Sequence, residues 1–157
     1  MVVSFRIRWQ YALVALVIAL FVPLGSDMAA DIDRSAVVVK VPSNIQWSGS
    51  PTSGAQSAVL MGDPSKPGLY IQLTKWHAHN MSRPHFHPND RYITVISGTW
   101  WKGTGTKYDP DSTVPIPAGS FVTDVAKGIH YDGAKDEDVV LEIVGMGPAT
   151  STSAEVK

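Results

Sequence analysis

The histidines of this chain are spaced as metal ligands would be. Four of the five fall within eleven residues and the fifth follows some forty residues later; in order they are His77, His79, His85, His87 and His130. In a strand, His85 and His87 project from the same side, about 7 Å apart along the backbone, so both can reach one ion. Two imidazoles do not complete a site, and His130 is the candidate for the third. The alternative is a surface histidine pair beside a turn.

The donor set restricts the metal. The chain has no cysteine, so a metal must be bound by histidine, carboxylate or carbonyl groups. Three neutral imidazoles bind first-row divalent ions and leave coordination positions open for water, dioxygen or a substrate. We expect one divalent ion at the site, chosen from Fe, Zn, Mn, Ni or Cu.

Short strands must position these histidines. Prolines and glycines interrupt almost every window of a dozen residues after Asp31, so long helices have little room. Turn clusters at 62–68, 87–90, 97–98, 103–112 and 131–137 separate runs rich in β-branched and aromatic residues. We predict strands at Ala36–Val41, Ala58–Met61, Leu69–Trp76, Arg91–Ile96, Thr99–Lys102, Ser120–Val125 and Val139–Val144. This number of short strands predicts an all-β sandwich or small barrel.

The N-terminus has the pattern of an export signal. Arg6 and Arg8 precede the uncharged run Tyr11–Leu24, and small residues follow it. As a helix the run measures about 21 Å, shorter than the roughly 30 Å core of a bilayer. We therefore predict a signal peptide at 1–30, either cleaved or kept as an uncleaved tether, and a periplasmic or secreted product. No stable membrane span is expected after cleavage.

The rest of the chain divides into three parts by composition. We predict an N-terminal extension with an edge strand at 31–54, the barrel at 55–147 and a frayed polar tail at 148–157. Thirteen basic residues against fourteen acidic ones leave no excess positive charge for a phosphate backbone. Nucleic acid is therefore not an expected partner, and a small molecule is.

The histidine pair opens a pattern that resembles the first motif of the cupin superfamily. That motif runs His-x-His, three or four residues, Glu, six residues, Gly. This chain has His85-Phe86-His87, three residues, Arg91, six residues and Gly98. The resemblance spans about residues 55–147.

The second cupin motif runs Gly, five residues, Pro-x-Gly, two residues, His. This chain has Gly119, five residues, Val125-Ala126-Lys127, two residues and His130. The resemblance implies a jelly-roll β-barrel whose metal sits inside near the mouth. It also implies a homodimer, because many cupins form one.

Several positions depart from the cupin pattern. Arg91 stands in place of the glutamate ligand, and Val125 and Lys127 replace the proline and glycine of the second motif. The ligand positions carried over are therefore the three histidines alone. Asp90 and Asp124 are nearby carboxylates that the pattern does not assign.

A second histidine pair precedes the first motif. If the strand Leu69–Trp76 continues in phase, His77 and His79 share the face of Leu69 and Leu73 and reach the barrel mouth. His79 is then an accessory residue of the site. In the alternative, the pair caps an exposed strand end.

The orientation of Arg91 affects which ligand the site can bind. If it points inward, its guanidinium repels the metal until a carboxylate or phosphate binds between them. Arg91 then clamps an anionic substrate and Tyr92 offers it a hydroxyl, and we place both as candidate catalytic residues. In the alternative, Arg91 turns outward and pairs with Asp90 or another surface acid.

Three functions fit these residues. The first is a mononuclear metal enzyme, a dioxygenase-like oxygenase or a hydrolase, acting on a small anionic substrate. The second is a non-catalytic cupin that stores, senses or sequesters a metal or a small ligand. The third is a metal-free, isomerase-like cupin in which Arg91 and His130 perform acid–base chemistry. Fold does not choose among them, because one barrel hosts many activities.

Overall fold

The computed structural model describes residues 32–52 and 54–156, so the predicted signal peptide at 1–30 lies outside the described residues. The chain divides into two units between Val37 and Val38, and the following description concerns the second. Among the described residues, the 3₁₀ turn Pro42–Asn44 precedes the first strand, and the 3₁₀ turn Pro110–Ser112 lies between two strands. No helix in 32–52 and 54–156 has the length and apolar character that crossing a membrane requires.

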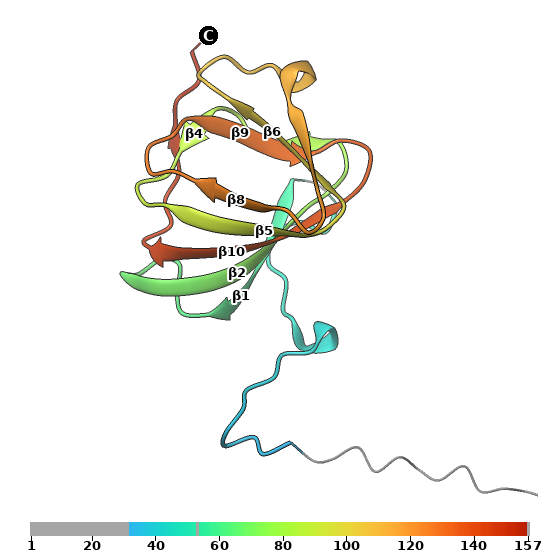
Figure 1. Ribbon diagram of the computed structural model, residues 1–157, viewed down its shortest axis with the longest axis vertical. Helices are drawn as coiled ribbons and strands as arrows, with labels where there is room; N and C mark the ends of the chain where they lie inside the picture. The colour runs from blue at the N-terminus through green and yellow to red at the C-terminus, as the bar shows by residue number, and fades with distance from the viewer. Residues whose placement is uncertain (1–31, 53, 157) are drawn as a thin grey trace, which may run out of the picture. The chain divides into compact units, whose positions relative to one another are not determined.

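The described strands form two sheets whose ladders are all antiparallel, which confirms the all-β prediction. The first sheet has the order β1 (Ala55–Met61), β2 (Gly68–Trp76), β10 (Val139–Gly147), β5 (Arg91–Ser97) and β8 (Phe121–Asp124). The second has the order β11 (Thr152–Ser153), β4 (His85–Phe86), β9 (His130–Ala134), β6 (Thr99–Thr104) and β7 (Val114–Pro117), with β3 (Asn80–Met81) paired to β9. Figure 1 shows the two layers.

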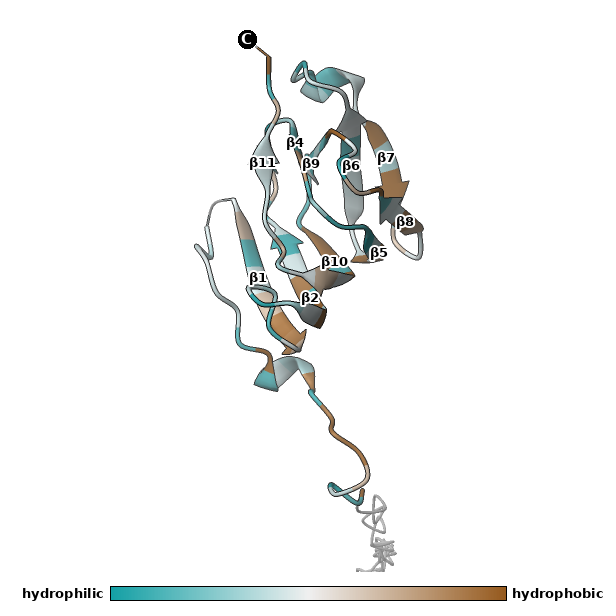
Figure 2. Ribbon diagram, turned by 90° about the vertical axis from the view of Figure 1, so that its left-hand side faces the viewer, coloured by the Kyte–Doolittle hydropathy of each residue, from teal (hydrophilic) through white to brown (hydrophobic). Residues whose placement is uncertain are grey.

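The core lies between the sheets, which face each other in the side view of Figure 2. Along β10, Val139, Leu141 and Ile143 are buried while the residues between them are more exposed, as expected for a strand with one face in the core. Ile93 and Trp100 join them from the two sheets and are almost completely buried. The core thus anchors β5 in the first sheet and β6 in the second, and both strands carry residues of the site.

One predicted strand is absent. Residues 37–41 of the predicted run Ala36–Val41 make no ladder, and Val38 is 88% exposed. The segment is held beside β1 by the Lys40 ammonium, which donates to the carbonyls of Val59 and Leu60. High β-propensity without a pairing partner does not make a strand.

One predicted turn is a buried strand. Residues 131–134 of the predicted turn cluster at 131–137 belong to β9, all of whose residues are buried. Its Gly133 accommodates the backbone of β3, because a Cβ there would lie 2.2 Å from the Asn80 carbonyl oxygen. Glycine in this position therefore permits close approach of two strands and does not mark a turn.

The C-terminal tail also differs from the prediction. Residues 148–157 were expected to fray, but Thr152 pairs with Phe86 and Ser153 with His85, forming β11 on the edge of β4. The polar composition reflects an edge strand with one solvated side.

The turn before His130 departs from the cupin motif in sequence and contains a residue in the left-handed conformation. Lys127, which stands where the motif has glycine, has φ +62°. The Lys127 N–H donates to the His87 carbonyl, and the Gly128 N–H donates to the Val125 carbonyl. The turn thus holds a left-handed residue with a side chain, a conformation that glycine adopts without strain.

We predict that Lys127→Gly stabilises the protein by about 0.5–1 kcal/mol, because relief of roughly 1–2 kcal/mol of left-handed strain exceeds the extra unfolded-state entropy of glycine. Chemical denaturation measures the change. Lys127→Ala is the matched control, because it removes the same exposed side chain and keeps the strain. Equal stabilities for the two variants would contradict the assignment of strain to this turn.

Candidate metal centre

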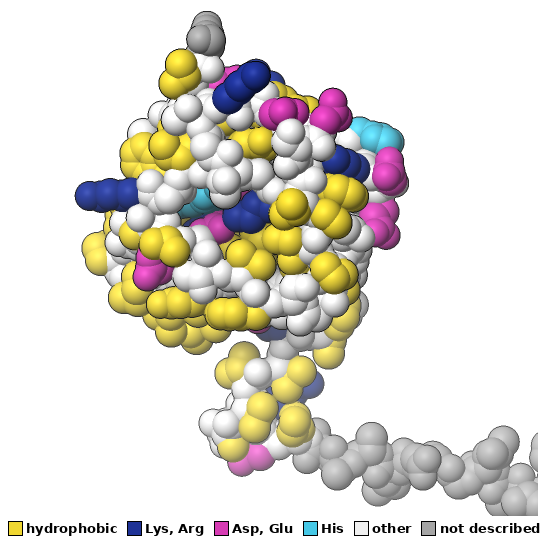
Figure 3. Space-filling view, turned by 45° about the horizontal axis from the view of Figure 1, so that its top comes forward, with side chains coloured by type: hydrophobic (Ala, Val, Ile, Leu, Met, Phe, Trp, Pro, Cys, Tyr) yellow, Lys and Arg dark blue, Asp and Glu magenta, His cyan; other side chains and the backbone are white. Residues whose placement is uncertain are grey.

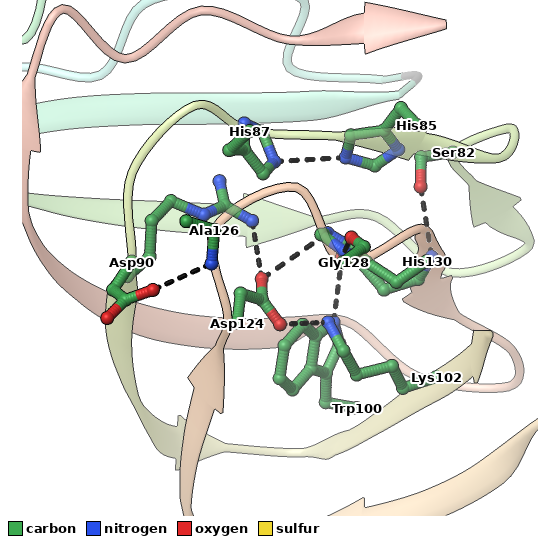
Figure 4. Close-up of polar contacts among 12 residues, drawn as sticks. Ser82, His85, His87, Asp90, Trp100, Lys102, Asp124, Ala126, Gly128 and His130 are labelled. Atoms are coloured by element: carbon green, nitrogen blue, oxygen red, sulfur yellow. Dashed lines mark hydrogen bonds and ion pairs between the residues drawn. The ribbon is translucent and has the colours of Figure 1, made fainter. Parts of the chain in front are cut away.

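Folding brings the three motif histidines together. β4 pairs with β9 so that His85 lies opposite His130, and His87 follows at the end of β4. One nitrogen from each ring lies within 4.8 Å of the other two. His87 and His130 are buried and His85 is half-buried, and Figure 4 shows the three rings converging above β8.

The backbone fixes the orientation of each ring. Each Nδ1 hydrogen bonds to a carbonyl: His85 to Arg83 at 2.8 Å, His87 to Thr150 at 2.8 Å and His130 to Gly128 at 2.9 Å. A carbonyl oxygen only accepts, so Nδ1 must carry the proton, and in the neutral ring Nε2 then has the lone pair. This is the arrangement expected of metal-binding histidines.

The Nε2 atoms lack adequate protein partners. The Nε2 atoms of His85 and His87 are 3.1 Å apart, so two lone pairs face each other unless a cation or a proton lies between them. The Nε2 of His130 is buried and has no hydrogen-bond partner among the described residues. Three convergent Nε2 atoms that make no hydrogen bond to any described residue outside the cluster fit a divalent ion.

The surroundings keep the buried rings neutral. Burial lowers the pKa of His87 to about 4, with a further contribution from the charge of Arg91. Burial, followed by the charge of Lys102, also lowers the pKa of His130. Neutral imidazole is the form that binds a metal.

Asp124 lies beside the histidines within a group of charges. Its Oδ2 is 2.6 Å from Arg91 Nη2 and 3.3 Å from His130 Nε2, and its Oδ1 is 2.5 Å from Lys102 Nζ. Burial alone would raise the pKa of Asp124, but the charges of Lys102 and Arg91 help to hold it at about 2. Asp124 is therefore a permanent buried anion between two cations.

The structure decides between the two expectations for Arg91. It lines the barrel cavity and its side chain is 14% exposed, so it points inward. Its partner is Asp124, which lies opposite it on β8. Asp90 instead accepts the Ala126 N–H at 2.7 Å and stabilises the turn before His130. Asp90 is thus not part of the site.

Sequence reasoning did not single out Lys102 or Asp132 as residues of the site. Asp132 is buried, its Oδ2 accepts the Trp100 indole N–H at 2.9 Å, and its Oδ1 lies 3.9 Å from His130 Nε2. Both residues follow strand alternation, Lys102 from Trp100 and Asp132 from His130. Recognition of β9 as a strand would have placed Asp132 on the site's face.

A cavity of about 490 Å³ opens beside the histidines inside the barrel. Its polar lining includes His85, His87, Arg91 and Asp132; its apolar lining includes Ile93, Leu141 and Ile143. The space-filling view of Figure 3 shows a hollow in which histidine, acidic and basic side chains are visible. The cavity can admit a small ligand with both charged and apolar parts.

Two other candidate residues lie away from the cluster. Tyr92 is 46% exposed on the outer face of β5 and stacks on Phe121. His79 is exposed, has φ +63° and donates its N–H to the Lys135 carbonyl. These positions correct the predictions that Tyr92 is a catalytic residue and that His79 is an accessory residue of the site.

The second histidine pair misses the barrel mouth because of the direction in which the side chains of β2 alternate. Gln72, Thr74 and Trp76 line the cavity, so Leu69 and Leu73 lie on the opposite face. His77 therefore misses the barrel mouth and contacts Gln56 and Asp138 instead. The expectation that this pair reaches the mouth was wrong.

Comparisons with known proteins place the fold. No protein-family model and no curated protein sequence matches the chain. The polyketide cyclase RemF from Streptomyces resistomycificus superposes with TM-score 0.62 at 12% identity, over 77% of this chain and 87% of that one. An uncharacterised protein with a double-stranded β-helix domain from Klebsiella pneumoniae gives 0.57 at 18%, over 76% and 97%.

A third structure, a cupin-like protein from Thermotoga maritima, gives TM-score 0.54 at 17% identity, over 68% of this chain and 84% of that one. At these identities the likeness concerns the fold. Two antiparallel sheets enclosing a cavity, the spacing of both motifs and these neighbours together show that the chain folds as a cupin-type, double-stranded β-helix barrel.

Proposed function

We propose that the protein is a metal-dependent cupin that binds one divalent ion through His85, His87 and His130 and acts on a small anionic molecule in the barrel cavity. The observation that carries this proposal is the convergence of three Nε2 atoms whose rings are each fixed by a carbonyl at Nδ1. When bound, the ion supplies a Lewis acid and lowers the pKa of coordinated water.

The charge balance favours an anionic ligand. The cations Arg91 and Lys102 are matched by the carboxylates Asp124 and Asp132. A divalent ion therefore adds positive charge for which these buried side chains provide no compensation, and an anion bound beside it supplies that compensation.

The residues around the cavity have distinct parts in this proposal. Arg91 has a buried Nε without a hydrogen-bond partner among the described residues, and its guanidinium can donate to a carboxylate. Asp124 keeps Arg91 oriented from β8. The apolar side chains of Ile93, Leu141 and Ile143 exclude water from the remaining part of the ligand.

A catalytic role, as an oxygenase or hydrolase, is the finer part of the proposal. The polyketide cyclase among the structural neighbours supports it, since it is an enzyme built on this fold. A non-catalytic metal- or ligand-binding protein is the alternative outcome. Export to the periplasm or medium and homodimer formation stay predictions.

We predict that His85→Ala and His130→Ala each abolish stoichiometric binding of a divalent ion, because each removes one of three nitrogen ligands. Elemental analysis of purified protein measures the metal content. His77→Ala is the control, because His77 lies outside the cluster and should retain the wild-type content. Equal metal content in all three variants would reject the site.

A second prediction concerns the ligand. Arg91→Gln should weaken binding of benzoate to the Zn²⁺-loaded protein by about 10- to 100-fold, the usual effect of losing a charged hydrogen bond. Isothermal titration calorimetry measures it. Lys127→Gln removes an exposed charge outside the cavity and should bind benzoate as the wild type does. An Arg91→Gln variant with unchanged affinity would show that Arg91 does not hold the anion.

A further inference from the structure

The C-terminal segment is hydrogen bonded to the strand that begins the histidine pair and to the loop that follows β6. Beyond the pairing of β11 with β4, the Ala154 N–H donates to the Pro84 carbonyl and the Val156 N–H donates to the Thr106 carbonyl. Ser151 and Ser153 line the rim of the cavity. The segment is therefore a wall of the candidate site.

The segment also orients one of the metal ligands. The Thr150 carbonyl, two residues before β11, accepts the Nδ1 proton of His87, and the Arg83 carbonyl, two residues before β4, accepts that of His85. The two neighbouring imidazoles are thus oriented by carbonyls from segments far apart in sequence. Their relative position depends on how firmly these segments are held together.

One ion pair joins these two segments. Arg83 Nε and Nη2 donate to the two carboxylate oxygens of Glu155 at 3.1 and 2.6 Å. The guanidinium also lies over the Tyr108 ring, 3.9 Å from its centre. A bidentate ion pair whose guanidinium also stacks on an aromatic ring fixes both the orientation of the two side chains and the distance between them.

We propose that Glu155 is a positioning residue for the metal centre: by binding the Arg83 side chain, it fixes the C-terminal segment so that the Thr150 and Arg83 carbonyls hold His87 and His85 in the geometry for metal binding. This inference rests on the proposed metal function. It assigns to the end of the chain a role in metal affinity that neither cupin motif contains.

The physical argument is one of pre-organisation. Mutation of the groups that orient metal ligands from behind typically weakens metal binding by about 10- to 100-fold. Arg83 is largely exposed and Glu155 is partly exposed, so the pair contributes modestly to overall stability. Its loss should therefore change metal affinity more than it changes folding.

The test is a titration of the metal-free 157-residue chain with Co²⁺ against a competing chelator. Glu155→Gln should weaken Co²⁺ binding about fivefold, the ratio that corresponds to the upper range for a single exposed ion pair. It should also alter the visible absorption of the Co²⁺-loaded protein, which responds to the arrangement of the ligand nitrogens. The charge-reversed double variant Arg83→Glu/Glu155→Arg should recover most of the affinity.

Lys66→Gln is the matched control, because it removes another exposed ion pair, Lys66–Asp63, that lies outside the candidate site. Denaturation of each metal-free variant verifies that it is folded. Wild-type affinity and spectrum in Glu155→Gln, or an equal loss in Lys66→Gln, would overturn the positioning role while leaving the metal site standing. Failure of the wild type to bind Co²⁺ would overturn the metal function and this inference together.

Discussion

The pairing of β4 with β9 is the constraint on which the candidate site depends. It places His85 opposite His130, although forty-five positions separate them in the chain. Both strands sit in the second sheet, where the close approach at Gly133 and the turn at Lys127 leave little freedom of register. Because side chains alternate along a strand, a slip of one residue would turn an imidazole away from the cavity.

Buried charge is the second determinant of the site. Arg91 occupies the position where a glutamate ligand is usual in cupins, yet a carboxylate is present, since Asp124 faces Arg91 from the adjacent strand. Lys102 approaches the same carboxylate from the opposite sheet. The charged side chains around the histidines are therefore paired with one another. This pairing offsets the cost of burying them, although the motif's carboxylate ligand is missing.

Much of this architecture is predictable from spacing and alternation. The motif positions of the histidines, and the strands that contain Arg91 and Trp100, follow from patterns that local geometry enforces. The failures have physical causes. Tyr-Asp-Gly in β9 has turn composition, but Trp100 satisfies Asp132, and the missing Cβ of Gly133 admits a neighbouring strand. The β-strand propensity of a short segment does not reveal such partners, because they come from distant parts of the chain.

The bonded C-terminus has a practical consequence for handling the protein. Val156 is tied by its N–H to Thr106, and Glu155 before it contacts Arg83. An affinity tag or reporter fused after Lys157 would begin one residue beyond Val156, and so next to a segment that lines the cavity. Fusion partners are therefore better attached elsewhere, and material purified through a C-terminal histidine tag would carry competing imidazoles close to the candidate centre.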